Sequence, residues 1–414
     1  MASGAQPRIR VLKWFRTLYM DRLTGSGRAL FWVTVLMGTA ASTSYMVKMY
    51  LLHCILVAFF AVSVALARLW RVPLIIRAHL PERSTCGARL AVAVTIRNRS
   101  RRDSVDTVIR PFGLPRHIRL SAELSLPHIP AGEEQSHLME LEFLQRGHFE
   151  FPGMSQETLF PWGLWRDVCF HKDPRAILVY PRFHPLRSLD VPVGKRYQPG
   201  GIALSSNLGD SAEFISTREF RQGDSLRAIH WRSWARVGTP IVKEFQEEYF
   251  CRIALLLDTF IPERLSERYA PAFEAAISIA AAVADCLSRE EYVIDLFAAG
   301  PEVYYFQAGR SLAHLENVLD ILACLGQCHE PPFEKITPLL LDHLERVTTT
   351  IVLLLDWDER REGLIRMIRE CGCAVKVILV RDSPPTMDSA SAEDLTGRIA
   401  RISTQDVEGG CEEL

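Results

Sequence analysis

The chain has 414 residues, 48% of them hydrophobic, and its 48 basic and 49 acidic residues give a formal net charge of −1. Because one domain usually has about 100–200 residues, this length predicts two soluble domains beside any membrane segment. The near-zero charge excludes a globally basic protein, so no nucleic-acid partner is expected. Ten scattered cysteines do not resemble the framework of a small secreted domain and are expected to be reduced thiols.

Two uncharged apolar runs occur near the N-terminus, Ala29–Val47 and Tyr50–Ala67. Each has roughly the 17–25 residues that a helix needs to cross a bilayer. Only Lys48 and Met49 separate them, so we predict a transmembrane helical hairpin over residues 29–71 with a very tight turn. The alternatives are a buried hairpin of a soluble core and a signal peptide. The length of the first run and the immediate second run favour two spans.

Basic residues dominate both flanks of this hairpin. Residues 1–28 hold six of them against the single acid Asp21, and Arg68, Arg71 and Arg77 follow the second run. Short flanks rich in arginine and lysine stay in the cytoplasm. The sequence therefore predicts a multi-pass protein of the inner (cytoplasmic) membrane, embedded in the lipid bilayer, with both termini and the soluble domains in the cytosol.

The two soluble domains differ in periodicity. Over residues 72–192, apolar and polar residues alternate, which predicts an antiparallel β-sandwich. Over residues 251–382, apolar strand-length runs alternate with amphipathic helices, which predicts an α/β domain with a mainly parallel sheet covered on both faces. Strands are expected at Arg252–Asp258, Tyr292–Ala298, Thr350–Asp356 and Ala374–Arg381, and helices at Ala270–Ser288, Ser311–Leu325 and Glu362–Cys371. Residues 383–414 are expected to form a polar tail.

A segment at residues 193–250 joins the two domains and holds the run REFRQGDSLRAIHWRSWARVGTPIVK. Gly223 and Asp224 indicate a turn, with Asp224 capping a helix that starts near Ser225. The candidate interaction residues are Arg218, Gly223, Asp224, Arg227, His230, Trp231, Arg232 and Arg236. One interpretation is an arginine and aromatic docking surface. The other is a structural junction in which Asp224 and Glu244 neutralise arginines.

This segment resembles the bacterial family known as domain of unknown function 58. The matching residues are Arg218, Phe220, Gly223, Asp224, Arg227, Ile229, His230, Trp231, Ala235, Arg236 and Glu244, and further matches lie at Arg146–Gly147, Pro161–Leu164 and Val179–Arg182. The resemblance implies a pair of membrane helices, a β-sandwich and a domain like the von Willebrand factor type A fold. Because relatives are commonly encoded beside them, it also implies a MoxR-type AAA ATPase as partner and a transglutaminase-like membrane protein as a further partner.

Metal and catalytic sites are weakly indicated. Asp258 and Asp356 follow two predicted strands, but Phe260 and Pro262 stand where metal-binding type A domains carry serines, so neither a metal nor another cofactor is expected. Helix N-capping is the alternative role of these aspartates. His230 has no identifiable nucleophile beside it. The sequence has no Gly-x-x-x-x-Gly-Lys loop, which excludes a P-loop nucleotide-triphosphatase.

These patterns favour a non-enzymatic, membrane-tethered adaptor that works with a MoxR-type ATPase in envelope or protein-complex maturation. The alternative is a hydrolase or ligand-binding protein, with or without metal assistance, that uses the strand-end aspartates and His230. The absence of a complete catalytic constellation in the sequence favours the adaptor.

Overall fold

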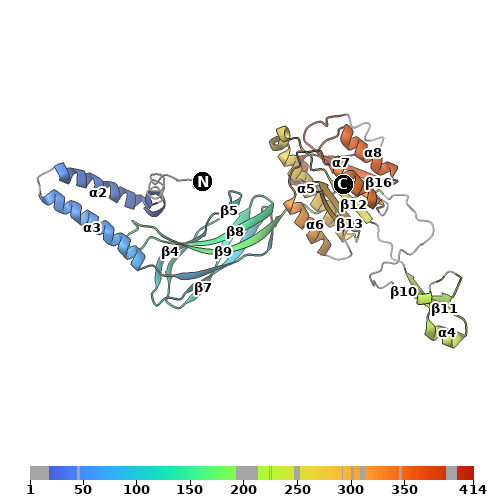
Figure 1. Cartoon of the computed structure of the whole chain (residues 1–414), viewed down its shortest axis with the longest axis horizontal. Coiled ribbons are helices and arrows are strands. Elements are labelled where there is room, and N and C mark those ends of the chain that lie inside the picture. Colours follow the sequence, from blue (N-terminus) through green and yellow to red (C-terminus); the bar gives the residue numbers. More distant parts are fainter. Residues whose placement is uncertain are drawn as a thin grey trace, which may run out of the picture. The chain divides into compact units, whose positions relative to one another are not determined.

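A computed structural model describes residues 18–43, 47–192, 213–222, 224, 226–246, 252–290, 292–299, 303–307, 313–344, 347–387 and 399–414. The chain divides into two compact units, Met1–Arg182 and Phe183–Leu414. Figure 1 labels many of their helices and strands.

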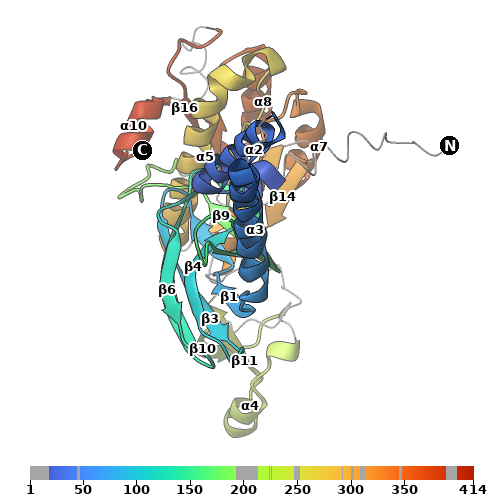
Figure 2. The same cartoon turned by 90° about the vertical axis from the view of Figure 1, so that its left-hand side faces the viewer.

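Two long helices open the first unit. After the π-helical turn η1 (Leu18–Arg22), α2 (Gly25–Thr43) and α3 (Val47–Leu69) pack side by side (Figures 1 and 2). Lys48 and Met49, predicted to form the turn between the helices, lie instead in the first turn of α3. No glycine or proline interrupts the run there, so the helix continues through both residues.

Two of the described helical stretches are long and apolar enough to cross a membrane, and length and composition alone are a weak indication of a span. The first is α3, with a mean hydropathy of 2.4 and only 6% of its apolar window buried. The second, Glu263–Arg289, is 72% buried and is the core helix of the α/β unit. The helix α2 does not meet the same criterion, because its first turn holds the polar residues Ser26 and Arg28.

The rest of the first unit consists of two curled sheets. One has the order β1 (Leu74–His79), β3 (Arg89–Asn98), β7 (Glu134–Phe143), β5 (Ile118–Leu120), and the other has the order β2 (Arg83–Thr85), β9 (Asp167–Tyr180), β8 (Gly147–Thr158), β4 (Ser104–Pro111), β6 (Leu124–Ile129). All pairs are antiparallel except β2 with β9. Because strand side chains alternate between faces, Val92, Val94 and Ile96 share one core with Ile109 and Ile177 of the other sheet. The antiparallel sheets predicted from period two are confirmed.

The second unit contains a six-stranded sheet in the order β14 (Val303–Gln307), β13 (Val293–Ala299), β12 (Arg252–Leu257), β15 (Thr349–Leu354), β16 (Ala374–Val380), β17 (Ala400–Ile402). Only β14 runs antiparallel to its neighbour, so five strands form a parallel sheet as predicted. A short turn η3 (Glu263–Leu265) leads into α5 (Ser266–Arg289), which lies with α6 (Ala313–Cys324) on one face. The helices α7 (Phe333–Leu344) and α8 (Glu359–Glu370) cover the other face (Figure 1).

The end of the chain differs from the predicted polar tail. Residues 399–414 contain the edge strand β17 and the helix α10 (Thr404–Gly409). Ile402 is 4% exposed and Val407 is 8% exposed, so both contribute to the core. These apolar side chains join the fold because β17 pairs with β16 in parallel.

The second unit also holds a small module ahead of its six-stranded sheet. β10 (Glu213–Glu219) and β11 (Ile241–Gln246) pair antiparallel and enclose the turn η2 (Leu226–Ala228) and the helix α4 (Trp231–Val237). Ile229 bridges to Val242, and the two are 7% and 4% exposed, which makes them the centre of this module. The helix ends at Gly238, whose φ of +84° is the left-handed conformation that glycine adopts at low cost.

Candidate functional site

The outer side of the β10–β11 module carries an apolar and basic surface. Its exposed side chains, named here the signature surface, are Leu226, Arg227, Trp231, Arg232, Arg236 and Val237. Leu226, Trp231 and Val237 are 69%, 65% and 56% exposed. Trp231 stacks on Trp234 with ring centroids 5.3 Å apart. The surface therefore offers aromatic and aliphatic area bordered by guanidinium groups, the composition that protein interfaces favour.

Asp224 has a different role from the one predicted. Its carboxylate accepts two hydrogen bonds from the guanidinium of Arg218, at 2.7 and 2.9 Å, and one from the backbone N–H of Arg221 at 2.8 Å. The bonds from Arg218, and then the one from Arg221, lower the pKa of Asp224 to about 2. The carboxylate thus ties β10 to the following turn. The prediction that Asp224 caps an α-helix is wrong, since α4 starts seven residues later at Trp231 and His230 is its N-cap residue.

His230 lies beside a hydroxyl that sequence reasoning missed. Its Nδ1 is 2.6 Å from the Oγ of Ser233, one helical turn along α4. Its backbone N–H donates to the carbonyl of Ile241 and fixes the start of the helix against β11. A serine beside a histidine is the pair from which a nucleophile and a base are built. Within the part of the chain that the structure describes, no carboxylate is bonded to the other ring nitrogen, so the third member of a triad is lacking.

The other sequence candidates of this segment fall partly outside the description. Gly223 and the side chain of Glu244 are not among the described residues, so the proposed pairing of Glu244 with an arginine stays a prediction. The pairing of Asp224 with an arginine is present. The structure thus contains one ion pair of the junction interpretation and the exposed surface of the docking interpretation in the same module.

At the carboxyl edge of the parallel sheet, a buried arginine binds the first candidate aspartate. Arg361 of α8 is 3% exposed, and its Nε donates to Oδ2 of Asp258 at 2.7 Å. Its other nitrogens donate to the Asp358 carboxylate and to the carbonyl of Phe260. The rings of Phe260 and Phe333 lie 5.6 and 5.5 Å from its guanidinium carbon. Burial lowers the pKa of Arg361, but the neighbouring carboxylates, led by Asp258, outweigh it and raise that pKa above its usual value.

A second arginine binds the other candidate aspartate. The guanidinium of Arg381, at the end of β16, forms an ion pair with Asp356 and donates to the hydroxyl of Tyr269 at 2.9 Å. Thr386 donates to Asp356 through both its hydroxyl and its backbone N–H. Burial raises the pKa of Asp356, but the bonds from Arg381 and Thr386 outweigh it and hold that pKa below its usual value. Two guanidinium groups therefore occupy the edge where ligands bind in open α/β folds.

These residues do not fit a divalent cation. Both aspartates already bind a positive group, and Phe260 and Pro262 supply no side-chain oxygen. In the described ranges, no three histidine, cysteine or acidic side chains are grouped to hold a metal ion. Helix N-capping by Asp258 or Asp356 is also wrong. The N-cap residues of η3 and α5 are Pro262 and Leu265, and Asp358 caps α8 through the backbone N–H of Arg361.

We accordingly expect Mg²⁺ to bind the full chain no more tightly than a dissociation constant of about 1 mM, the weak end of oxygen-ligand sites. Isothermal calorimetry on the detergent-solubilised protein measures this, with the Asp258→Ala variant as control. A saturable site of micromolar affinity that disappears in Asp258→Ala would contradict the expectation.

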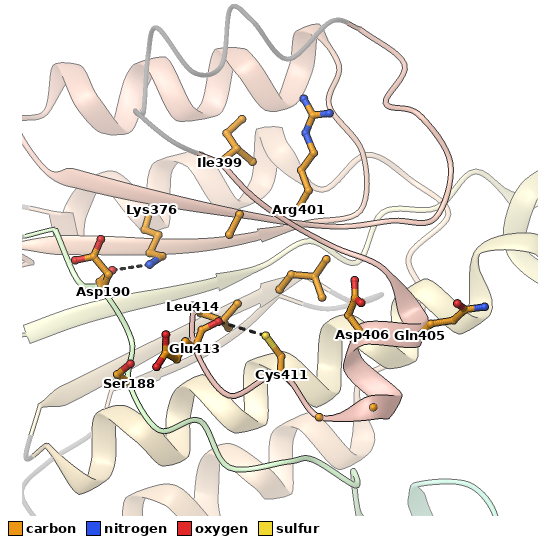
Figure 3. Close-up of a pocket in the computed structure, with 14 residues that line it drawn as sticks. Ser188, Asp190, Lys376, Ile399, Arg401, Gln405, Asp406, Cys411, Glu413 and Leu414 are labelled. Carbon is orange, nitrogen blue, oxygen red and sulfur yellow. Dashed lines mark hydrogen bonds between the residues drawn. The ribbon is translucent and has the colours of Figure 1, made fainter.

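A hollow of about 900 Å³ lies at the β17 edge of the second unit (Figure 3). In it, the amine of Lys376 donates to the carbonyl of Asp190 at 2.6 Å, and burial lowers the pKa of Lys376. Residue Glu413 forms a parallel bridge with Ser188. The walls of the hollow carry the basic residues Lys376 and Arg401 together with acidic residues such as Asp190 and Glu413. The hollow therefore favours neither an anionic nor a cationic ligand.

The fold and the surface together define a two-unit protein: curled antiparallel sheets with an apolar N-terminal helix, and a parallel α/β unit preceded by an arginine–tryptophan module. Residues 216–383, which include the signature surface, match the family described as "Protein of unknown function DUF58". The chain is 26% identical over 245 residues to the "Uncharacterized protein YeaD" of Bacillus subtilis. The match spans 57% of this chain and 58% of that relative, so the chain covers little more than half of the relative's length.

Two solved structures that match part of the chain show low similarity to it. A fragment of alpha-2-macroglobulin from Escherichia coli matches 28% of this chain and 18% of its own, at 15% identity and a TM-score of 0.20. Proximal thread matrix protein 1 of the mussel byssus matches 39% of this chain and 43% of its own, at 10% identity and a TM-score of 0.28. These values support no conclusion about function.

Proposed function

We propose that this protein is a non-enzymatic adaptor, tethered to the cytoplasmic membrane, that presents its signature surface to a MoxR-type AAA ATPase. The observation that carries the proposal is the exposure of Leu226, Trp231 and Val237 among arginines. Tryptophan and arginine are the residues most enriched at binding hot spots. The arginines favour an acidic surface on the ATPase, since complementary charge steers association.

The α/β unit supports an adaptor rather than an enzyme. Its sheet, covered by helices on both faces, is similar in plan to a von Willebrand factor type A fold, and the curled sheets of the first unit are similar to a β-sandwich. Arg361 and Arg381 fill the carboxyl edge where such a fold would hold a metal or substrate. Binding energy is then supplied by the exposed module, and the α/β unit acts as its rigid support. Envelope or protein-complex maturation, with a transglutaminase-like membrane protein as a second partner, is the process that the family resemblance favours.

The hydrolase alternative has one observation in its favour, the contact between His230 and Ser233. If this pair were catalytic, Ser233→Ala would abolish hydrolysis of an activated ester by the full chain and leave capture of the ATPase unchanged. The adaptor proposal expects no such hydrolysis from the unsubstituted protein. Capture of a purified MoxR-type ATPase by the detergent-extracted full chain is the direct test of the proposal, and failure to capture any such ATPase would contradict it.

The membrane tether predicts a definite topology. With α2 and α3 as a hairpin and basic residues at both flanks, the C-terminus is expected in the cytosol. A reporter active only in the cytosol, fused after Leu414, should give a strong signal, and a reporter active only outside it should give none. The reversed pattern would exclude both the topology and a cytosolic ATPase partner.

A further inference from the structure

The turn between β8 and β9, residues 159–166, runs along the apolar helix α3. The ring of Trp162 lies 4.9 Å from that of Phe59, and the ring of Phe160 lies 6.0 Å from that of Trp70. At 1.5 Å per residue, Phe59 is about 15 Å from Leu69, the end of α3. The turn therefore extends about 15 Å along α3 from its C-terminal end at Leu69 back to Phe59.

The same turn is fixed to the start of α2. Thr24 donates from its hydroxyl to the carbonyl of Gly163 at 2.5 Å, and its backbone N–H donates to the carbonyl of Leu164 at 3.3 Å. A Cβ added to Gly27 would lie 2.1 Å from that Leu164 oxygen, so the backbones approach closely. Trp165, only 5% exposed, forms a bridge with Leu23. The turn is thus held in place by both helices.

Beyond these contacts, only short stretches of α2 and α3 remain, which run to Thr43 in α2 and to Val47 in α3. From Gly27 to Thr43, α2 extends about 24 Å, and from Val47 to Phe59, α3 extends about 18 Å. The hydrocarbon core of a bilayer is about 30 Å thick. A bilayer that surrounds the hairpin therefore extends beyond Phe59 and reaches the turn.

The side chains of the turn suit that position. Leu159 and Trp162 are 38% and 44% exposed, and Leu69 and Trp70 beside them are 70% and 49% exposed. Tryptophan is enriched where acyl chains meet headgroups. Arg68 is exposed near the end of α3, and Arg102 donates to the carbonyl of Leu69 at 3.2 Å. In the described part of the chain neither has a carboxylate partner, which leaves both guanidinium groups available to anionic headgroups.

We propose that the β8–β9 turn is a third membrane anchor, whose Leu159 and Trp162 insert at the boundary of headgroups and acyl chains while Arg68 and Arg102 bind anionic lipid. The proposal rests on the membrane tether of the proposed function. It gives the curled sheets a fixed contact with the lipid surface, beyond the two helices.

Cysteine labelling of the full chain tests this anchor. Purified Trp162→Cys and Leu159→Cys variants, reconstituted without other proteins in vesicles of phosphatidylethanolamine and phosphatidylglycerol, are treated with a maleimide that does not cross membranes. Leu144→Cys is the matched control, because Leu144 is 41% exposed and lies beyond the opposite end of β8. Along a twelve-residue strand, that end is roughly 36 Å away. Labelling of the ten native cysteines in the unsubstituted chain is subtracted.

Both turn variants are expected to react at least about tenfold more slowly than Leu144→Cys, because a site 5–10 Å deep in the interface excludes the reagent. Reaction of Leu159→Cys at the rate of Leu144→Cys would overturn the anchor, even if Trp162→Cys failed to fold. The topology is tested separately in native vesicles. There, labelling of Leu144→Cys only from the face opposite the cytosol would refute the proposed topology. The rate comparison would still decide whether the turn inserts.

Discussion

Replacing Arg361 with methionine is expected to destabilise the α/β unit by about 3–5 kcal/mol, the usual effect of removing one partner from a buried ion pair. The side chains of Arg361 and Asp258 are 3% and 1% exposed and their charged atoms are 2.7 Å apart. Without the guanidinium, the donors that the Asp258 carboxylate keeps among the described residues are the backbone N–H groups of Phe260 and Leu355. A buried charge with so little compensation is costly, and the unit should melt at a clearly lower temperature.

Arg366→Met on the same helix is the matched control. Arg366 is 58% exposed and pairs with Glu362 at 2.8 Å across one helical turn. Exposed pairs of this kind contribute about 0.3–0.5 kcal/mol, so the control should melt almost as the unsubstituted chain does. Differential scanning calorimetry of the full chain compares the two variants. Equal melting of Arg361→Met and Arg366→Met would refute a structural role for the buried pair.

A second substitution separates lost charge from lost packing. In the double variant Asp258→Asn with Arg361→Met, the unpaired carboxylate is gone, so part of the lost stability should return. The contacts of the guanidinium with the rings of Phe260 and Phe333 would still be missing. If the double variant is no more stable than Arg361→Met, packing against the aromatic rings rather than the Asp258 charge is the main contribution.

The sequence predicted the strands of the α/β unit well and the chemistry at their ends poorly. The expected strand Arg252–Asp258 is observed as β12, Arg252–Leu257, because a continuous apolar run of this length has few other folds available. The sequence also showed that serines were missing near Asp258. It did not show that Arg361 binds the carboxylate, since the two residues are 103 positions apart and only the fold brings them together.

The hydrogen bonds of Asp224 also could not be predicted from the sequence. Gly223 and Asp224 fit a helix N-terminus, but Asp224 binds Arg218 on β10 instead, because a charge-assisted pair across the turn competes with a cap. The strand β17 was missed for a similar reason. It has only three residues, and its residue Ala400 pairs with Ile378 of β16, far earlier in the chain. No local sequence pattern therefore predicts this strand.

Replacing Trp231 with alanine is expected to weaken capture of the ATPase by about thirtyfold or more, which corresponds to the loss of a hot-spot side chain worth at least about 2 kcal/mol. Trp231 is 65% exposed, and its main described contact is the stacked ring of Trp234. Such an aromatic pair contributes about 0.5–1.5 kcal/mol, so the module should remain folded. Leu138→Ala is the control, since Leu138 is 72% exposed in the other unit. It should leave capture unchanged.

The arginines of the module separate docking from structure. Arg227 and Arg232 are exposed, so Arg227→Ala and Arg232→Ala should change stability by no more than about 0.5 kcal/mol. Both should reduce capture, and the unsubstituted complex should weaken with added salt because exposed charges are screened. Arg218→Ala should instead lower the stability of the module, because Arg218 donates two hydrogen bonds to the Asp224 carboxylate.

The stability of the module at acid pH should also separate the structural role of Arg218 from the docking role of Arg232. The pKa of Asp224 is lowered to about 2 by Arg218, so this pair stabilises the module above the ordinary aspartate pKa near 4 and is lost as the pH falls toward 2. Arg218→Ala should remove that dependence, whereas Arg232→Ala should keep it. Normal melting of Trp231→Ala, Arg227→Ala and Arg232→Ala with undiminished capture of the ATPase would exclude the signature surface as the docking site. The module would then be a structural junction, and the partner would have to bind elsewhere on the chain.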